Sequence, residues 1–235
     1  MLREAERNSI IPFNYLATVE PLVSHGEQRG VFSQGELQRL FPEDYKQAVN
    51  IWGRLEYVSL FCVLATTGLR KGEVRALQWK HVIGDERGKA LVIERAVKHN
   101  EEIGTTKTGT ERVVVLNRKA QDYLSMWQKE SPFTGQDDLI FFGQNADTPI
   151  TGKTLLIRFQ KALENVKISR EGRNLIIHSF RHTYNTLLKS VLPKEILQAT
   201  TGHTSDRMTE HYNHPTAKDT YEAVIQHGDV FDKLF

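Results

Sequence analysis

The chain has 235 residues, of which 39% are hydrophobic and 26% are charged, and its formal net charge is +2. These values are typical of a globular protein with one domain or two small ones, and they exclude a disordered chain. No apolar run approaches the roughly 20 residues that a membrane-spanning helix needs, and the first residues are charged where a signal peptide would be apolar. A single cysteine, Cys62, excludes an internal disulfide framework, so we expect an intracellular, cytoplasmic protein.

The N-terminal segment, residues 1–32, shows no clear hydrophobic periodicity, and we expect it to be a linker or the remnant of a preceding segment. After it, Ser33 and Glu36 have the spacing of a capping box, in which each side chain bonds a free backbone N–H of the other residue. This box predicts a short helix that runs to about residue 41.

Two further helices are expected next. Residues 45–67 carry apolar side chains nearly all round, which indicates one long, buried helix that ends at Gly68. The apolar surroundings of Cys62 in this stretch favour a packing role for its thiol. A second helix is expected from about residue 70 to about residue 79.

The middle of the chain changes period. Residues 82–83, 90–97 and 112–116 are short runs rich in β-branched side chains, separated by turn residues. They predict a small three-stranded antiparallel sheet, with residues 107–110 as the turn between its last two strands.

From residue 117 onward the pattern is helical again. Six helices are expected, at residues 117–130, 151–166, 178–190, 193–201, 205–212 and 216–226. There is no internal repeat and no low-complexity tract. The sequence therefore predicts an α+β fold that is mostly helical, with a small sheet inserted early.

Positive charge is concentrated between residues 153 and 189. Eight Lys and Arg residues in this stretch face two acidic residues, Glu164 and Glu171. Such a patch can neutralise the phosphates of a nucleic acid, although Lys and Arg on helix surfaces are more often simply solvated.

Two familiar site patterns do not hold. The Gly-Lys-Thr at residues 152–154 resembles the end of a phosphate-binding loop, but the glycine required five positions earlier is Asp147. His178 and His182 have the spacing of a zinc protease motif, but Ser179 stands where that motif needs glutamate. We therefore expect no cofactor and no metal, and a phosphodiesterase that uses the histidines with a metal is a distant alternative.

Several basic residues and one tyrosine remain as candidates for chemistry. Arg70 follows a sharp turn, and Arg181 lies one helical turn after His178, which places both on one helix face. His203 and Tyr212 lie nine residues apart. Taken one at a time, each could be a structural residue instead, because arginines pair with acids and aromatic or histidine side chains pack in cores.

Together these segments resemble the tyrosine recombinase (phage integrase) family. The resemblance rests on TGLRKGEVRALQW at 67–79, KTGTERVVV at 107–115, IHSFRHTYNT at 177–186, TGHT at 201–204 and EHYNH at 210–214. These motifs occur in the family's order and at similar spacing over about residues 33–225. The resemblance implies the DNA breaking–rejoining enzyme fold, with residues 33–235 as the catalytic domain and its C-terminal helix.

The resemblance also implies the chemistry. The hydroxyl of Tyr212 would attack a DNA phosphodiester, which gives a 3′-phosphotyrosine and a free 5′-hydroxyl. In the implied catalytic set, two arginines and a histidine bind the phosphate oxygens, a second histidine assists the nucleophile, a lysine protonates the leaving oxygen and a glutamate supports an arginine. These are Arg70, Arg181, His203, His178, Lys107 and Glu73 respectively.

The implied partner is double-stranded DNA, on which the family assembles into tetramers through the C-terminal helix, and no membrane is involved. Family members usually carry a helical DNA-binding domain before the catalytic one, whereas about 32 residues precede the helix at Ser33 here, so we expect a fragment or an incomplete DNA clamp. Two alternatives stay open. One is DNA relaxation of the type IB topoisomerase kind, and the other is a DNA-binding regulator that has lost catalysis.

Overall fold

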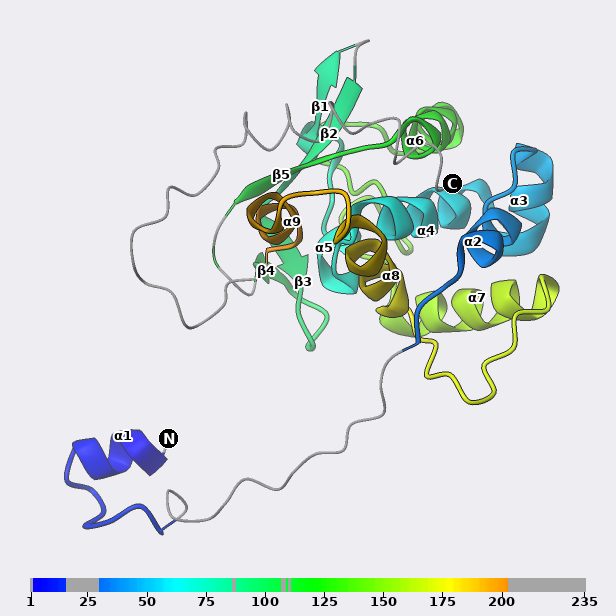
Figure 1. Cartoon of the computed structure of the whole chain (residues 1–235). Coiled ribbons are helices and arrows are strands. Elements are labelled where there is room, and N and C mark those ends of the chain that lie inside the picture. Colours follow the sequence, from blue (N-terminus) through cyan, green and yellow to red (C-terminus); the bar gives the residue numbers. More distant parts are fainter. Residues whose placement is uncertain (1, 16–29, 86–87, 107–108, 110, 203–235) are drawn as a thin grey trace.

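The structure, a computed structural model, describes residues 2–15, 30–85, 88–106, 109 and 111–202. Helices surround a central helix, α4, and two small sheets lie to one side of it (Figure 1). The described helices are α1 Leu2–Arg7, α2 Gln34–Leu40, α3 Tyr45–Trp52, α4 Leu55–Thr67, α5 Lys71–Arg75, α6 Arg118–Glu130, α7 Gly152–Asn165, α8 Ser179–Leu188 and α9 Lys194–Thr201. The strands are β1 Val82–Asp85, β2 Gly88–Ile93, β3 Arg95–Val97, β4 Ile103–Thr105 and β5 Arg112–Val115. The predicted α+β class is confirmed.

The capping box at the start of α2 is present as predicted. The Glu36 amide donates to the Ser33 hydroxyl over 3.3 Å, and the Ser33 amide donates to the Glu36 carboxylate over 2.8 Å. Upstream, α1 lies in a segment for which the sequence predicted no helix. Its six residues have Glu4 in the first turn and Arg7 in the last, which is the favourable arrangement for the helix dipole.

The prediction of a single long helix over residues 45–67 is wrong. The chain forms two helices, α3 and α4, whose axes are bent by 95° at Gly53. Gly53 has φ +89°, a left-handed conformation that other residues adopt only with strain, and its amide closes α3 by donating to the Val49 carbonyl. Both helices pack into the same core, so the apolar pattern continues through the bend. The pattern alone therefore does not reveal the bend.

Helix α4 forms the centre of the hydrophobic core, and each of its 13 residues is buried. Aromatic rings pack around its N-terminal half: Phe61 stacks on Trp52 with ring centroids 4.3 Å apart, and Trp52 stacks on Phe41. The helix ends at Gly68 as predicted, with φ +64°. A side chain at Gly68 would collide with the ring of Tyr184 in α8, at 2.6 Å, so this glycine also allows α8 to pack closely.

The helix predicted from residue 70 to 79 is shorter than expected. Helix α5 ends at Arg75, and Trp79–His81 form a separate 3₁₀ turn. The backbone between them pairs with another segment: the Leu77 carbonyl accepts a hydrogen bond from the Ile140 amide, and Gln78 forms a β-bridge with Leu139. This pairing draws the chain away from the helical path.

The three-stranded antiparallel sheet is confirmed, with strand order β1-β2-β5. The predicted strand at residues 90–97 is, however, interrupted at Glu94, and its second half, β3, pairs with β4 in a separate two-stranded sheet that the sequence did not reveal. In the first sheet Ile93 pairs with Arg112, at the start of β5. Of the predicted turn at residues 107–110, only Gly109 belongs to the described part of the chain.

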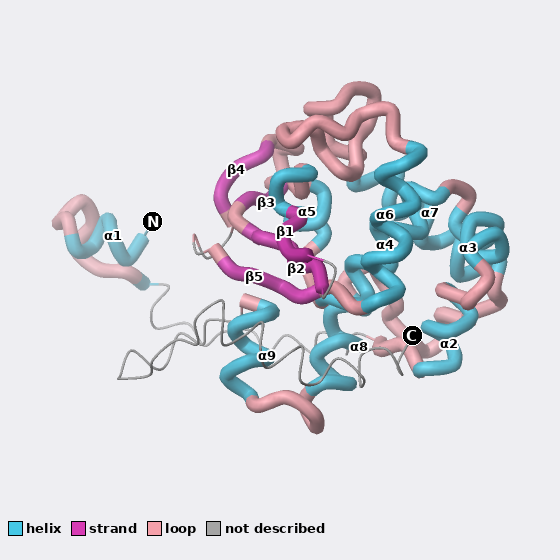
Figure 2. Tube along the Cα trace, turned by 90° about the horizontal axis from the view of Figure 1, so that it is seen from above, coloured by secondary structure: helices cyan, strands magenta, loops and turns pink. Residues whose placement is uncertain are grey.

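The predicted helices at residues 117–130, 151–166, 178–190 and 193–201 are confirmed as α6, α7, α8 and α9, whereas those at 205–212 and 216–226 lie outside the described residues. Tyr184, Leu188 and Leu192 form a second, small apolar cluster against Ile196 and Val115. This cluster fixes α9 beside α8 and β5 (Figure 2). The end of α9 thereby comes close to the start of α5.

Among the described helices, none is by itself long and apolar enough to cross a membrane. Helices α3 and α4 reach that length and apolarity only as a pair, across their bend, and α4 is buried inside the protein.

Candidate active site

Four of the candidate residues lie in the described part of the chain. Arg70 precedes α5, Glu73 lies within it, His178 precedes α8 and Arg181 lies in its first turn. The other three candidates, Lys107, His203 and Tyr212, lie outside the described residues. The described part of the site is centred on its two arginines and the groups that hold them.

Arg70 and Glu73 are joined at the start of α5. Nη1 of Arg70 donates to Oε1 of Glu73 over 2.9 Å, and the Arg70 backbone amide donates to Oε2 over 2.8 Å. Glu73 is 1% exposed, whereas 26% of the Arg70 side chain is exposed. The buried carboxylate thus holds a guanidinium that solvent, or a ligand, can reach.

A third arginine, which the motif analysis did not single out, completes this cluster. Arg112 donates from Nη1 and Nη2 to the two oxygens of Glu73, over 3.1 and 2.7 Å. Glu73 and Arg112 are 39 residues apart in the sequence, and only the tertiary fold brings them together. The one available signal was the position of Arg112 in the 107–115 motif, which identifies a strand but no partner.

The C-terminal end of α9 contacts all three arginines. Three successive carbonyls each accept from a different guanidinium: Thr200 from Nε of Arg112 over 2.8 Å, Thr201 from Nη2 of Arg181, and Gly202 from Nη2 of Arg70 over 3.1 Å. The carbonyls at this end of a helix carry partial negative charge, so three cations are well placed there. Arg181 also donates to the Gly68 carbonyl over 2.7 Å, where α4 ends.

Burial and charge act in opposite directions on these groups. Burial alone would raise the pKa of Glu73, but the hydrogen bonds and charge of Arg112, and the hydrogen bonds from Arg70, bring it below its usual value. Burial lowers the pKa of Arg181 to about 10, and the charges of Arg70 and Arg112 add to this effect while Glu73 opposes it. Arginine side chains carry a positive charge in proteins, so the cluster combines three positive charges with the one negative charge of Glu73.

His178 lies one turn before Arg181, at the residue that precedes α8. It is half-buried, and its ring lies edge-on to that of His182 with centroids 5.0 Å apart. The two histidines of the rejected zinc pattern are thus neighbours at the start of α8. Within the described residues, no group of three His, Cys, Asp or Glu side chains could hold a metal ion.

A tyrosine other than Tyr212 lies beside the cluster. Tyr184 is 4% exposed, packs on Gly68 and bonds the hydroxyl of Thr200. Burial raises the pKa of Tyr184 above its usual value. A hydroxyl that is both buried and harder to deprotonate is a poor nucleophile, which assigns Tyr184 a packing role.

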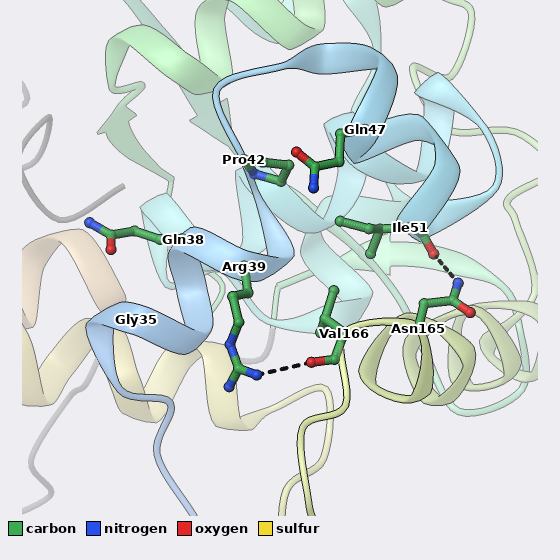
Figure 3. Close-up of a pocket in the computed structure, with 8 residues that line it drawn as sticks. All are labelled: Gly35, Gln38, Arg39, Pro42, Gln47, Ile51, Asn165 and Val166. Carbon is green, nitrogen blue, oxygen red and sulfur yellow. Dashed lines mark hydrogen bonds between the residues drawn. The ribbon is translucent and has the colours of Figure 1, made fainter.

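A surface pocket of about 480 Å³ lies between α2, α3 and α7 (Figure 3). Two hydrogen bonds join the elements that line the pocket. Arg39 donates to the Val166 carbonyl over 3.0 Å, and Asn165 donates to the Ile51 carbonyl over 2.7 Å. These helices lie on the other side of α4 from α9 (Figure 1), and the pocket contains none of the candidate residues. It is separate from the arginine cluster.

Arg70, 26% of whose side chain is exposed, is the arginine of this cluster that a phosphate group can reach directly, whereas Arg181 is 2% exposed. Guanidiniums donate paired hydrogen bonds to such oxygens and keep their charge at every physiological pH. Fixed positive groups of this kind also stabilise the extra negative charge that a phosphate gains during nucleophilic attack.

A model of the phage integrase family matches residues 32–219. Comparison with curated protein sequences finds no match. The fold is similar to that of the Tn1549 transposon integrase, solved in complex with transposon right end DNA (TM-score 0.65, 19% identity, 94% of this chain and 74% of that chain).

Two further solved structures have the same fold. The lambda integrase tetramer bound to a Holliday junction gives a TM-score of 0.59 at 20% identity, over 90% of this chain and 57% of that chain. The XerH site-specific recombinase bound to its difH substrate gives 0.55 at 17% identity, over 86% of this chain, and the match spans about half (50%) of the XerH chain. Because the family model covers most of the sequence, the protein belongs to the phage integrase family of tyrosine recombinases.

Proposed function

We propose that this chain is the catalytic part of a site-specific DNA recombinase that acts in the cytoplasm, in integration or excision, through a covalent link on Tyr212. The observation that carries the proposal is the convergence of Arg70 and Arg181 on successive carbonyls at the end of α9. The residue that follows Gly202 is His203, so the third candidate phosphate ligand adjoins the same helix end in the sequence.

The proposed reaction is a transesterification. The Tyr212 oxygen forms a bond to phosphorus as the bond from phosphorus to the 5′-oxygen breaks, and Lys107 gives that oxygen a proton. His178 takes or orients the tyrosine proton, while Arg70, Arg181 and His203 bind the non-bridging oxygens. The phosphotyrosine retains the energy of the broken diester, so a 5′-hydroxyl from another strand can reverse the step without ATP.

The described surface supports DNA as the partner. The ammonium of Lys71, which follows Arg70, lies next to Gly152 at the start of α7. From there α7 carries the exposed cations Lys153 and Lys161 along its length. Positive charge thus continues from the arginine cluster onto a surface helix, which is the distribution that a DNA backbone requires. The similar integrases and the XerH recombinase were solved with DNA.

We further propose that residues 33–235 form the catalytic domain and that residues 1–32 are a linker. The family model begins at residue 32, beside the capping box of α2, which supports this division. The apolar C-terminal segment, residues 216–235, would dock on a neighbouring protomer in a tetramer on DNA. The tetrameric assembly of lambda integrase on a Holliday junction is the precedent for this arrangement.

The test is covalent trapping on a pool of nicked duplexes whose central sequence is randomised. A nick close to the cleaved phosphate lets the short 5′-hydroxyl fragment diffuse away, so the protein–DNA adduct accumulates and survives denaturation. We expect the wild-type chain to form the adduct, and peptide mapping to find the phosphate on Tyr212. Sequencing of the trapped DNA would give the preferred duplex.

Two phenylalanine variants make the test specific. Tyr212→Phe should abolish the adduct and leave DNA binding nearly unchanged, because it removes only the attacking oxygen. Tyr184→Phe, the matched control beside the arginines, should still form it. The assignment of the nucleophile would be refuted if Tyr212→Phe still formed the adduct, or if only Tyr184→Phe lost it. Relaxation of a supercoiled plasmid that lacks the trapped sequence would favour the topoisomerase alternative, and DNA binding by a wild-type chain that never forms the adduct would favour the regulator.

A further inference from the structure

We propose that Arg112 is a positioning residue of this active site, which fixes Arg70 through Glu73 and fixes the end of α9 through the Thr200 carbonyl. The proposal rests on the proposed function, since it concerns the rate of DNA cleavage. Arg112 does not need to touch the DNA, because 91% of its side chain is buried and its three nitrogens all donate to protein oxygens.

The carboxylate of Glu73 is fully hydrogen-bonded. Its two oxygens accept four hydrogen bonds, two from Arg70 and two from the fork of Arg112. A carboxylate has about four acceptor positions, so these bonds leave it no freedom to rotate. Without Arg112, two of these positions would be empty, and Glu73 could turn and take the Arg70 guanidinium with it.

Arg112 also contacts the C-terminal end of α9. Nε of Arg112 donates to the Thr200 carbonyl, and a Cβ added to Gly202 would lie 3.4 Å from Cζ of Arg112. The side chain therefore packs against the helix end whose next two carbonyls, those of Thr201 and Gly202, hold Arg181 and Arg70. Because the chain continues from Gly202 directly to His203, a shift of this helix end would move a candidate phosphate ligand as well.

The position of Arg112 in the chain connects it to a third segment. It begins β5, five residues after Lys107, and Ile93 of β2 holds that strand end in register. One side chain thus joins the strand that follows the lysine segment, the helix that follows Arg70 and the helix that precedes His203. A simple buried ion pair would need only the contact with Glu73, whereas the fork and the bond to Thr200 use the full planar geometry of a guanidinium.

The experiment compares Arg112→Lys with Arg173→Lys. Arg173 makes the same set of bonds away from the site, two to the carboxylate of Glu36 over 2.7 and 3.0 Å and one to the Val31 carbonyl over 2.7 Å. Single-turnover adduct formation is measured with saturating protein on the duplex recovered from the randomised pool. Under these conditions the rate constant reports the bound complex and is independent of the fraction of protein that is folded.

We expect Arg112→Lys to lower this rate constant about 10- to 100-fold, because a displacement of about 1 Å of the phosphate-binding groups costs that much. DNA affinity should change by less than about twofold, since Arg112 makes no DNA contact in the proposal. Arg173→Lys should lower the melting temperature by less than Arg112→Lys, because its side chain is 34% exposed, and should leave the rate constant unchanged.

Glu73→Gln provides a second, independent measurement. If Arg112 acts through Glu73, the double variant Arg112→Lys/Glu73→Gln should react little more slowly than the slower single variant, whereas independent effects would multiply. An unchanged rate constant for Arg112→Lys, or multiplying effects in the double variant, would overturn the proposal. Failure of the wild-type chain to form any adduct would instead overturn the proposed function.

Discussion

At the scale of single residues, Glu56 in α4 makes the stability of the protein depend on pH. Its side chain is 2% exposed, and its Oε1 has no hydrogen-bond partner. Burial raises the pKa of Glu56 from 4.5 to about 7, against the opposing charge of Arg54 and a backbone hydrogen bond from Phe142. The folded protein thus favours the neutral carboxyl, and ionisation of this group costs folding free energy.

The sign of the effect follows from the raised pKa. The contribution of the neutral Glu56 carboxyl to the free energy of unfolding is complete below about pH 4.5 and is lost as the pH rises through about 7. The loss is on the order of 3 kcal/mol, at about 1.4 kcal/mol per unit of pKa shift. Glu56→Gln should remove this dependence, so that the variant gains stability relative to the wild type between pH 5 and pH 8 in urea unfolding. Glu130→Gln, on the exposed end of α6, is the control. If the difference in free energy of unfolding between Glu56→Gln and the wild type stayed constant across this pH range, the assignment would be contradicted.

Residue motifs predicted part of the site. Arg70 with Glu73, and His178 with Arg181, each lie within one helical turn, so the sequence spacing itself brings them near each other. Arg112 could not be predicted in the same way, because its partners are 39 and 88 residues away in the chain. Contacts of that separation depend on how β5 and α9 pack, which local patterns do not contain.

At the scale of elements, the bend between α3 and α4 depends on Gly53. Its φ of +89° costs any other residue about 1–2 kcal/mol, and an added Cβ would lie 3.3 Å from the Arg158 guanidinium. Gly53→Ala should therefore lower the free energy of unfolding by at least about 1 kcal/mol, measured by urea denaturation.

Gly35, in the helix α2, is the matched control for this prediction. It has an ordinary helical φ, and an added Cβ would meet nothing within 4 Å. Gly35→Ala should raise the free energy of unfolding by about 0.5–1 kcal/mol, because alanine loses less backbone entropy in a helix. If Gly35→Ala were destabilising, or Gly53→Ala neutral, the backbone φ would not determine how alanine changes the free energy of unfolding at these two positions.

The elements themselves were largely predictable, and their boundaries were less so. Capping residues located the start of α2 correctly because the capping contact is local. The break at Gly53 was hidden by apolar residues on both sides, and the split at Glu94 was hidden because β2 and β3 form one β-branched run that feeds two different sheets. In both cases a tertiary contact decides where one element ends and the next begins.

At the scale of the whole molecule, the charge on α7 predicts how DNA binding responds to salt. Lys153 and Lys161 are exposed on this helix, which begins beside Lys71. If both contact phosphates, Lys153→Gln/Lys161→Gln should weaken binding to every duplex alike and reduce the slope of log K against log salt by about two. Fluorescence anisotropy with a short duplex between 50 and 200 mM salt measures this slope.

Lys46→Gln/Lys129→Gln is the control for the same measurement. Both lysines are exposed, on α3 and α6, and the change in net charge is identical. If the two double variants lowered the slope equally, the effect would come from total charge, and α7 would have no special place against the DNA.

The three carbonyls at the end of α9 make the assembly of the site depend on a single helical register. Successive residues of a helix are turned by about 100° around its axis, so the register of α9 decides which carbonyls at its end lie beside the three arginines. An insertion of one residue within α9 would turn all three acceptors away together, whereas one in the connection at residues 189–193 could be absorbed before the helix begins. Natural variants of this protein should therefore differ in length before α9 and hardly ever within it.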